Sequence, residues 1–323
     1  MSQTAIRPRS PSFVQLHQDD HAAVRAELAA GLQASAAFTH PKYLYDALGS
    51  RLFEAITELP EYYPTRTEAA IFARHAPEMA ALLPAGMTLV DLGAGNCEKA
   101  ARLFDVLRPS RYVAVDISVE FLRSALQRLQ RQHPVMEMVG VGMDFSAHLT
   151  LPPEAGEGQR LMFYPGSSIG NFTPRDALAF LRQARQATQG GGLLIGVDLV
   201  KPLGVLVPAY DDALGVTAAF NRNMLLYINR LLGSDFDVSQ WRHRALFNSP
   251  DARIEMHLDA QQDVTVRWPG VQREFKQGES IHTENSCKYT PQQFEDMLRA
   301  AGFSRVQQWR DAQDWFAVFL ARE

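Results

Sequence analysis

The chain has few cysteines and no long apolar run, and each absence excludes a class of protein. Its 323 residues contain only two cysteines, Cys97 and Cys287, which are too few and too far apart for a disulfide framework or a zinc site. We therefore expect two reduced thiols and no metal. No apolar run approaches the length that spans a bilayer, and residues 1–13 lack the apolar core of a signal peptide. The sequence predicts a cytoplasmic protein with no membrane segment.

Strong charge of either sign is also missing. The formal net charge of -4 gives no general footprint for binding nucleic acid, so we expect a small-molecule substrate and a monomer. The apolar content of 46% and the charged content of 21% are typical of a globular protein. The length allows two domains or one elaborated domain.

The N-terminal region predicts helices before any strand of a sheet. Residues 1–12 combine two prolines with Ser and Arg and show no periodicity, so we expect a flexible tail without chemistry. The Ala- and Leu-rich residues 19–32 and the segment 51–57 predict helices.

A strand, a glycine turn and a helix follow, an arrangement that favours nucleotide binding. Apolar residues 87–91 run into Gly93-Ala-Gly95, and a helical pattern begins near Cys97. The next strand ends in Asp116, about 20 residues beyond the glycines, where a doubly wound sheet places a carboxylate on a ribose diol. The glycines alone could serve only a tight turn. Glu98 stands where a dinucleotide fold prefers a third glycine, which disfavours NAD.

Further strands and helices alternate, which predicts an α/β fold with a mostly parallel sheet. The expected strands are 136–141, 160–164 and 193–197, with a helix at 175–187. Near the C-terminus, Thr290-Pro-Gln-Gln293 predicts a capped helix that ends at Gly302, and strands 306–310 and 315–321 then form a hairpin. Between Leu199 and Cys287 we expect an insertion with a helix through residues 216–231. In that insertion we also expect strand 253–258 with 264–268 as its hairpin partner.

Several sequence blocks together resemble a specific family. Asp91-Leu-Gly-Ala-Gly95 resembles the first motif of class I S-adenosylmethionine-dependent methyltransferases, and the whole set resembles the L-histidine Nα-methyltransferases of ergothioneine biosynthesis. The further blocks are Tyr45-Asp46, Leu59-Pro-Glu-Tyr-Tyr-Pro-Thr-Arg66, Pro165-Gly-Ser-Ser-Ile-Gly-Asn-Phe172, Asp198-Leu-Val-Lys201 and Thr283-Glu-Asn-Ser286. The resemblance spans nearly the whole chain after the tail.

The resemblance implies a class I methyltransferase Rossmann-like sheet with a second, mixed α/β substrate-binding domain. Residues 13–64 and 199–287 would form the substrate-binding domain, and residues 65–198 and 288–323 the methyltransferase domain. Members of the family convert histidine, through its mono- and dimethyl forms, to the betaine hercynine.

The resemblance also assigns roles to individual residues. It implies that S-adenosylmethionine is held by Gly93, Lys99, Asp116, Asp144 and Phe145. The backbone groups of the amino acid would contact Tyr62, Asn171 and Tyr210, and its imidazole would contact Glu284 and Ser286, with Met256 beside the ring and Tyr45 near the methyl-transfer region. Neutral phenol and amide donors would then bind the carboxylate without a fixed cationic charge.

Alternatives remain for the central pair. A strand places Glu284 and Ser286 on one face, where they could hold both imidazole nitrogens, but an exposed polar loop is the alternative. Met256 is more readily explained as core filler than as a ligand contact. The chain also departs from commoner family versions at Ala94-Gly-Asn-Cys97 and at Glu284-Asn-Ser-Cys287. A methyltransferase for another amino acid or small amine, and a non-catalytic cofactor-binding protein, therefore stay in view.

Overall fold

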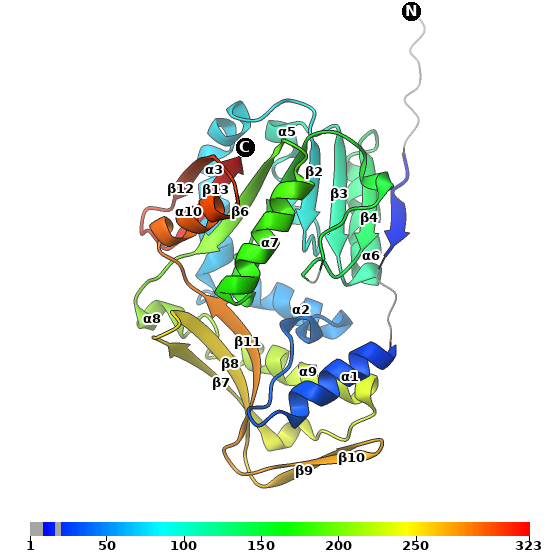
Figure 1. The fold of residues 1–323 in the computed structure, drawn as a ribbon, viewed down its shortest axis with the longest axis vertical. Helices are drawn as coiled ribbons and strands as arrows, with labels where there is room; N and C mark the ends of the chain where they lie inside the picture. The colour runs from blue at the N-terminus through cyan, green and yellow to red at the C-terminus, as the bar shows by residue number, and fades with distance from the viewer. Residues whose placement is uncertain (1–8, 17–20, 147) are drawn as a thin grey trace, which may run out of the picture.

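An eight-stranded sheet forms the upper part of the molecule (Figure 1). The computed structural model describes residues 9–16, 21–146 and 148–323. Six strands run parallel, and the last two form an antiparallel hairpin, which confirms both expectations for the sheet. In spatial order the strands are β1 (Ser12–Gln15), β4 (Glu137–Gly142), β3 (Arg111–Asp116), β2 (Thr88–Leu92), β5 (Arg160–Tyr164), β6 (Gly192–Asp198), β13 (Phe316–Arg322) and β12 (Arg305–Arg310).

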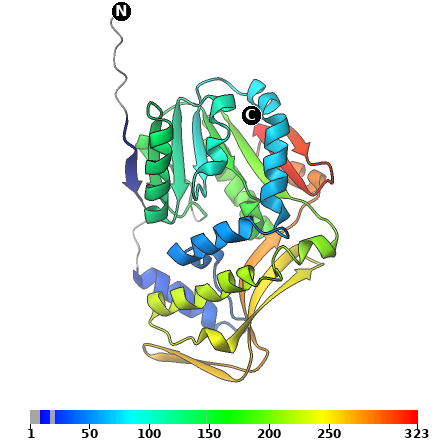
Figure 2. The same cartoon turned by 180° about the vertical axis from the view of Figure 1, so that it is seen from behind.

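Helices cover both faces of this sheet (Figures 1 and 2). Successive strand residues point to opposite faces, so Leu89 packs in one apolar core and Val90 in the other. Because both faces are buried, the central strands are largely apolar. One face packs against α3 (Tyr63–Ala81), α4 (Glu98–Ala101), α5 (Phe104–Leu107) and α6 (Val119–Gln132), and the other against α7 (Pro174–Ala187) and α10 (Pro291–Ala300). The predicted capping box at Thr290 begins α10.

The lower part of the molecule joins the N-terminal helices to the insertion through one apolar core that runs from Leu28 to Ile281. Its elements are α1 (His21–Gln33), η1 (Pro41–Leu44), α2 (Ala47–Thr57), α9 (Val216–Leu232), a three-stranded antiparallel sheet of β7 (Trp241–Asn248), β8 (Arg253–Ala260) and β11 (Ser280–Cys287), and a ribbon of β9 (Val264–Trp268) and β10 (Val271–Phe275). This shared core brings together segments that lie far apart in the sequence.

The expected pairing of the insertion strands is wrong. Strand β8 pairs with β7 and β11, whereas β9 pairs with β10. The connection Pro269-Gly270 between β9 and β10 is a two-residue hairpin loop, and Gly270 has a φ of 80°. A two-residue loop with a positive φ favours pairing of the two strands that it joins, and β9 therefore pairs with β10, the strand that follows it.

The N-terminal boundaries also differ from the expectation. Residues 12–15 form β1 beside β4, so residues 13–15 belong to the large sheet and not to the substrate-binding part. Residues 1–8 of the expected tail, and residues 19 and 20 of the expected first helix, lie outside the described residues. Helix α2 begins earlier than expected because the Asp46 carboxylate accepts a hydrogen bond from the Gly49 N–H at 2.8 Å. In the described part of the chain, every helix is too short or too polar to cross a bilayer.

Candidate active site

A large cleft opens where β2, β3 and β4 end. After β2, Gly93 and Gly95 adopt φ angles of 71° and 51°, which residues with a Cβ rarely adopt. At the end of β3, one Asp116 oxygen accepts from Gly95 N–H at 2.9 Å and the other from Ser118 N–H at 2.8 Å. All five residues predicted to hold the cofactor line the cleft: Gly93, Lys99, Asp116, Asp144 and Phe145.

The end of β4 contributes Asp144 and Phe145. The Phe145 ring packs against Tyr164, with the ring centroids 5.8 Å apart. Asp144 accepts from the Ser146 N–H at 3.1 Å and lies 3.5 Å from the Lys42 ammonium. Burial opposes ionisation of Asp144, but the Ser146 hydrogen bonds and the Lys42 charge outweigh burial and lower its pKa. Sequence reasoning missed Lys42, which η1 brings from the other part of the molecule.

Lys99 is fixed by a second residue that sequence reasoning missed. Its ammonium donates to Glu68 of α3 at 2.9 Å. The other Glu68 oxygen accepts from the Gly166 N–H at 2.7 Å, and Glu68 is almost fully buried. Glu68 therefore joins the cofactor cleft to the turn after β5. A glutamate within the amphipathic pattern of a helix gave no signal of this role.

A smaller cavity adjoins the cleft, and it is lined by all six predicted substrate residues and by Tyr45, which was predicted for the methyl-transfer region. These seven residues are Tyr45, Tyr62, Asn171, Tyr210, Met256, Glu284 and Ser286. Four of the seven, namely Tyr45, Tyr62, Asn171 and Glu284, also line the large cleft. Because the two spaces share these walls, a molecule in the cavity would lie directly beside one in the cleft.

Aromatic rings form one side of the cavity. The Tyr45 ring lies 5.6 Å from Phe53 and 5.5 Å from Phe220, and the Tyr62 ring lies 6.1 Å from Phe53 and 6.4 Å from Tyr210. Burial raises the pKa of both Tyr45 and Tyr62 well above the usual value, so the phenols keep their protons. Sequence reasoning missed Phe53 and Phe220, because an aromatic residue on an apolar helix face predicts only a core position.

Glu284 and Ser286 lie on the same face of β11, as the strand interpretation predicts. A register shift lies between His282 and Glu284, before the pair, and the pairing is regular beyond it, with Glu284 opposite Met256 and Ser286 opposite Ile254. Both side chains are at most 8% exposed, so the exposed-loop alternative is wrong. Met256 lines the cavity and also packs in the apolar core, so both interpretations of it hold.

The turn after β5 brings Asn171 to the same cavity. This residue ends η3 (Ser168–Asn171), which packs against β11. A Cβ on Gly170 would lie 3.0 Å from the carbonyl oxygen of Cys287, so only glycine allows this approach without displacing the strand. Burial raises the pKa of Glu284 to about 7, against the opposing influence of the Lys288 charge and a hydrogen bond from Asn171.

The departures from commoner family sequences lie partly in the wall of the cleft and partly behind it: Ala94, Asn96 and Asn285 line the large cleft, whereas the two cysteines line neither pocket. Cys287 is buried, and its thiol donates to the Phe172 carbonyl at 3.4 Å. Cys97 is buried with a φ of 65° at the start of α4. Burial raises the pKa of both thiols, so both remain protonated packing groups.

A buried lysine overturns the expectation of a cavity without fixed cationic charge. Lys288 donates to the Ser286 hydroxyl at 2.7 Å and to the Tyr210 hydroxyl at 2.9 Å, and it lies 2.8 Å from an Asp198 oxygen. The second Asp198 oxygen accepts from Lys201, and Tyr63 donates to Asp198 at 2.6 Å. The alternation of β11 gave a signal, because Lys288 lies two residues beyond Ser286 and shares its face.

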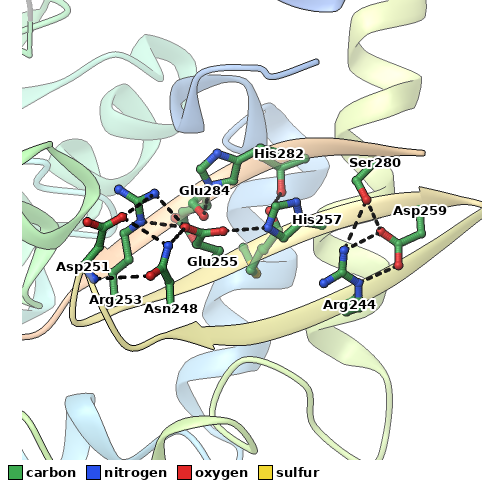
Figure 3. Close-up of polar contacts among 12 residues, drawn as sticks. Arg244, Asn248, Asp251, Arg253, Glu255, His257, Asp259, Ser280, His282 and Glu284 are labelled. Carbon is green, nitrogen blue, oxygen red and sulfur yellow. Dashed lines mark hydrogen bonds and ion pairs between the residues drawn. The ribbon is translucent and has the colours of Figure 1, made fainter. Parts of the chain in front are cut away.

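Beside the cleft, which His282 also lines, the same three-stranded sheet carries a polar cluster (Figure 3). Among the described residues, Glu255, His257 and His282 place possible metal ligands within 4.8 Å of one another. The two rings are stacked at 4.8 Å with 20° between their planes, and Arg253 already pairs with Glu255. Imidazole binds a metal in the plane of its ring, so near-parallel rings cannot share one ion without rotating. We assign these contacts to holding the strands together.

Comparisons with known proteins identify similar chains. The model of a family described as histidine-specific, S-adenosylmethionine-dependent methyltransferases matches residues 24–323. A histidine N-alpha-methyltransferase of Mycolicibacterium smegmatis is 43% identical over 306 residues, which cover 93% of this chain and 94% of that protein. Ergothioneine biosynthesis protein 1 of Neurospora crassa is 30% identical over 292 residues, which cover 86% of this chain and 32% of that protein.

Among solved structures, the chain is similar to the 1,6-didemethyltoxoflavin-N1-methyltransferase of Burkholderia thailandensis with bound S-adenosylhomocysteine. The TM-score is 0.43 and the identity is 15%, over 90% of this chain and 93% of that chain.

Proposed function

The chain belongs to the histidine-specific, S-adenosylmethionine-dependent methyltransferases, and we propose that it methylates the α-amino group of L-histidine. Three successive transfers give hercynine, N,N,N-trimethylhistidine, in the first step of ergothioneine biosynthesis. The observation that carries this proposal is the buried pair Glu284 and Ser286 in a cavity that shares its walls with the cofactor cleft.

The donor set of the cleft fits S-adenosylmethionine. Each Asp116 oxygen accepts one backbone N–H and keeps lone pairs for the two hydroxyls of a ribose. The glycine turn lets a ligand approach the backbone, and Phe145 offers apolar surface with Asp144 beside it as an acceptor. Lys99, which also lines the cleft, adds a cationic donor to these groups. When bound there, the cofactor supplies a methyl group on a positively charged sulfur.

The cavity residues then position histidine. Glu284 and Ser286 bind the two imidazole nitrogens with Met256 beside the ring, and Tyr62, Asn171 and Tyr210 bind the backbone groups. Positioning of this kind saves roughly 7–11 kcal/mol of a reaction barrier. The neutral α-amine attacks directly, without a covalent enzyme intermediate.

No strong base is needed, because the amine can lose its proton to water before each attack. Tyr45 lies near the methyl-transfer region, and because its pKa is raised the phenol serves as a hydrogen-bonding group and an aromatic face. Such faces attract the quaternary product by about 0.5–2 kcal/mol each.

The proposal includes a division of labour within the chain. Residues 199–287 and the N-terminal segment up to residue 64, without β1, form the substrate-binding domain, and residues 65–198 and 288–323 form the methyltransferase domain. The shared apolar core of the lower part supports this division. We place the protein in the cytoplasm as a monomer that acts on small molecules and binds neither nucleic acid nor membrane.

Mass spectrometry of the products tests the proposal. The purified protein is incubated with S-adenosylmethionine and an equimolar mixture of the twenty amino acids. We expect methyl groups on histidine alone, reaching the trimethyl form, and histidine product from Glu284→Ala that forms about 100-fold or more slowly. Methylation of another amino acid or small amine would show that histidine is not the substrate. Cofactor binding without any methylated product would contradict an enzymatic role.

A further inference from the structure

We propose that Lys288 is a specificity-determining positioning residue: its buried ammonium fixes the hydroxyls of Ser286 and Tyr210 as hydrogen-bond donors toward the substrate, so that the cavity accepts the neutral imidazole and rejects the imidazolium. The inference rests on the proposed function and names the protonation state of the substrate that the site takes.

The hydrogen-bond capacity of Lys288 is the first argument. An ammonium has three N–H donors and no acceptor. Lys288 has three partners, which are an Asp198 oxygen at 2.8 Å, the Tyr210 hydroxyl at 2.9 Å and the Ser286 hydroxyl at 2.7 Å. Its donors are therefore fully used, and it points none of them at the substrate.

The hydroxyl protons are the second argument. Because Lys288 donates to both oxygens, neither hydroxyl can direct its own proton at Lys288. The two oxygens lie 2.7 Å apart, so one proton bridges them until a ligand binds and the other faces the cavity. A bound amino acid can then receive both protons, one on its carboxylate from Tyr210 and one on a ring nitrogen from Ser286. That ring nitrogen must carry a lone pair.

Charge is the third argument. The side chain of Lys288 is completely buried, and its positive charge lies directly behind Ser286. An imidazolium bound at Ser286 would bring a second positive charge close to it among buried side chains, where repulsion is strong. The Glu284 carboxylate, which faces the other ring nitrogen, accepts the single N–H of the neutral ring.

The surrounding titratable groups support this arrangement. Lys288 faces Asp198 from the end of β6, Tyr210 from the segment before α9, and Glu284 from β11, the strand that ends just before Lys288. Glu284 also faces Tyr45 and Tyr62. Burial opposes the charge on Lys288, but Asp198 and Tyr210 outweigh it and raise the pKa.

Lys201 offers a matched control. It pairs with the same Asp198 carboxylate, and it donates to the Tyr63 hydroxyl at 2.9 Å and to a backbone carbonyl. Like Lys288, it lines neither the cavity nor the cleft, but its hydrogen bonds go to Tyr63, Asp198 and Leu199 and not to the substrate residues Ser286 and Tyr210. Burial lowers the pKa of Lys201 to about 8, so Lys288 is the firmer of the two charges.

The test compares the binding of histidine with that of β-(1,2,4-triazol-3-yl)alanine, whose ring stays uncharged down to pH 5. Dissociation constants are measured by calorimetry with S-adenosylhomocysteine present, between pH 5 and pH 8. Protonation of Glu284 affects both ligands and cancels in the ratio of the two constants. We expect the dissociation constant of histidine, divided by that of the triazole, to rise nearly tenfold for each unit by which the pH falls below the imidazole pKa of about 6.5. A flat ratio in the wild-type protein would overturn the proposal, and this measurement needs no variant.

Variants then assign the effect to Lys288. In Lys288→Met we expect the ratio to change less than threefold over the same range and histidine binding at pH 8 to weaken about tenfold. In Lys201→Met the ratio should depend on pH as strongly as in the wild-type protein. An equally strong pH dependence in Lys288→Met would refute the role of Lys288. If the wild-type protein neither binds nor methylates histidine at pH 8, the proposed function itself fails, which is a different result from a flat ratio.

Discussion

The five residues predicted to hold the cofactor lie at or just beyond the ends of three strands, β2, β3 and β4, whereas the residues predicted to hold the substrate come from both parts of the chain. Each of these cofactor residues is placed by the strand that immediately precedes it. In the cavity, Tyr45 and Tyr62 meet Glu284 across more than half of the chain. A site of the first kind depends on local turn geometry, and a site of the second kind depends on how two parts pack.

The principal carboxylate of each pocket shows the same difference. Asp116 is held by backbone N–H groups of Gly95 and Ser118, which no side-chain substitution removes. Glu284 depends on the side chains of Asn171 and Lys288 to offset its burial. The chemistry of the cleft is thus fixed by the fold, and that of the cavity can be tuned by single substitutions.

Removal of the cavity carboxylate should have the largest effect. In Glu284→Ala we expect kcat/KM for histidine to fall by about 100-fold or more, because a hydrogen bond to a charged group contributes about 1.5–3 kcal/mol and its loss also leaves a buried donor unpaired. Steady-state kinetics give the value. The affinity for S-adenosylhomocysteine should stay within twofold of the wild-type value. A large decrease in this affinity would mean that Glu284 also contributes to the cofactor cleft.

Removal of the cleft carboxylate should produce the opposite pattern. In Asp116→Ala we expect the KM for S-adenosylmethionine to rise about 10- to 100-fold, because two ribose hydroxyls lose their acceptor. The experiment is a cofactor titration at saturating histidine. An unchanged cofactor KM would remove Asp116 from the cofactor site.

The pH dependence should differ between the two pockets. Glu284 has a pKa near 7, and its ionised form accepts the ring N–H, so the ionised fraction and the affinity for histidine both rise as pH increases from 6 to 8. The histidine ring also loses its proton near pH 6.5, which acts in the same direction. The two effects multiply, so we expect the KM for histidine to fall about 40-fold over this range. The affinity for S-adenosylhomocysteine, measured in the same buffers, should vary less, and an equal variation would contradict the contrast.

The smallest effect is expected at the junction between the two parts. Tyr63→Phe removes the hydroxyl that donates to Asp198 and accepts from Lys201, while both lysines remain. We expect a loss of about 1–2 kcal/mol in the free energy of unfolding and near-normal kinetics. Thermal unfolding, together with the KM for both substrates, checks this. A changed histidine KM with unchanged stability would mean that Tyr63 acts on the cavity.

The contrast also explains what the sequence could predict. The glycine turn, Asp116 and the strand alternation of Glu284 with Ser286 follow from local rules, and the structure places these residues as expected. Phe53, Phe220 and Glu68 were missed because a core position and a ligand-facing position have the same local pattern. The predicted partner of β9 was wrong because the alternation of residues along a strand does not identify the strand with which it pairs. Lys288 was missed although its spacing was visible, because a lysine is rarely buried.

Strand β1 has a consequence for the behaviour of the protein in solution. Residues 12–15 pair in register with Val139 to Gly142, and Phe13 packs against Gly140 under the guanidinium of Arg123. Without this strand, β4 would present a row of unpaired backbone donors and acceptors, which is a template for strand-to-strand association between molecules. By covering the edge of β4, these four residues should make aggregation less favourable, an effect that is independent of catalysis.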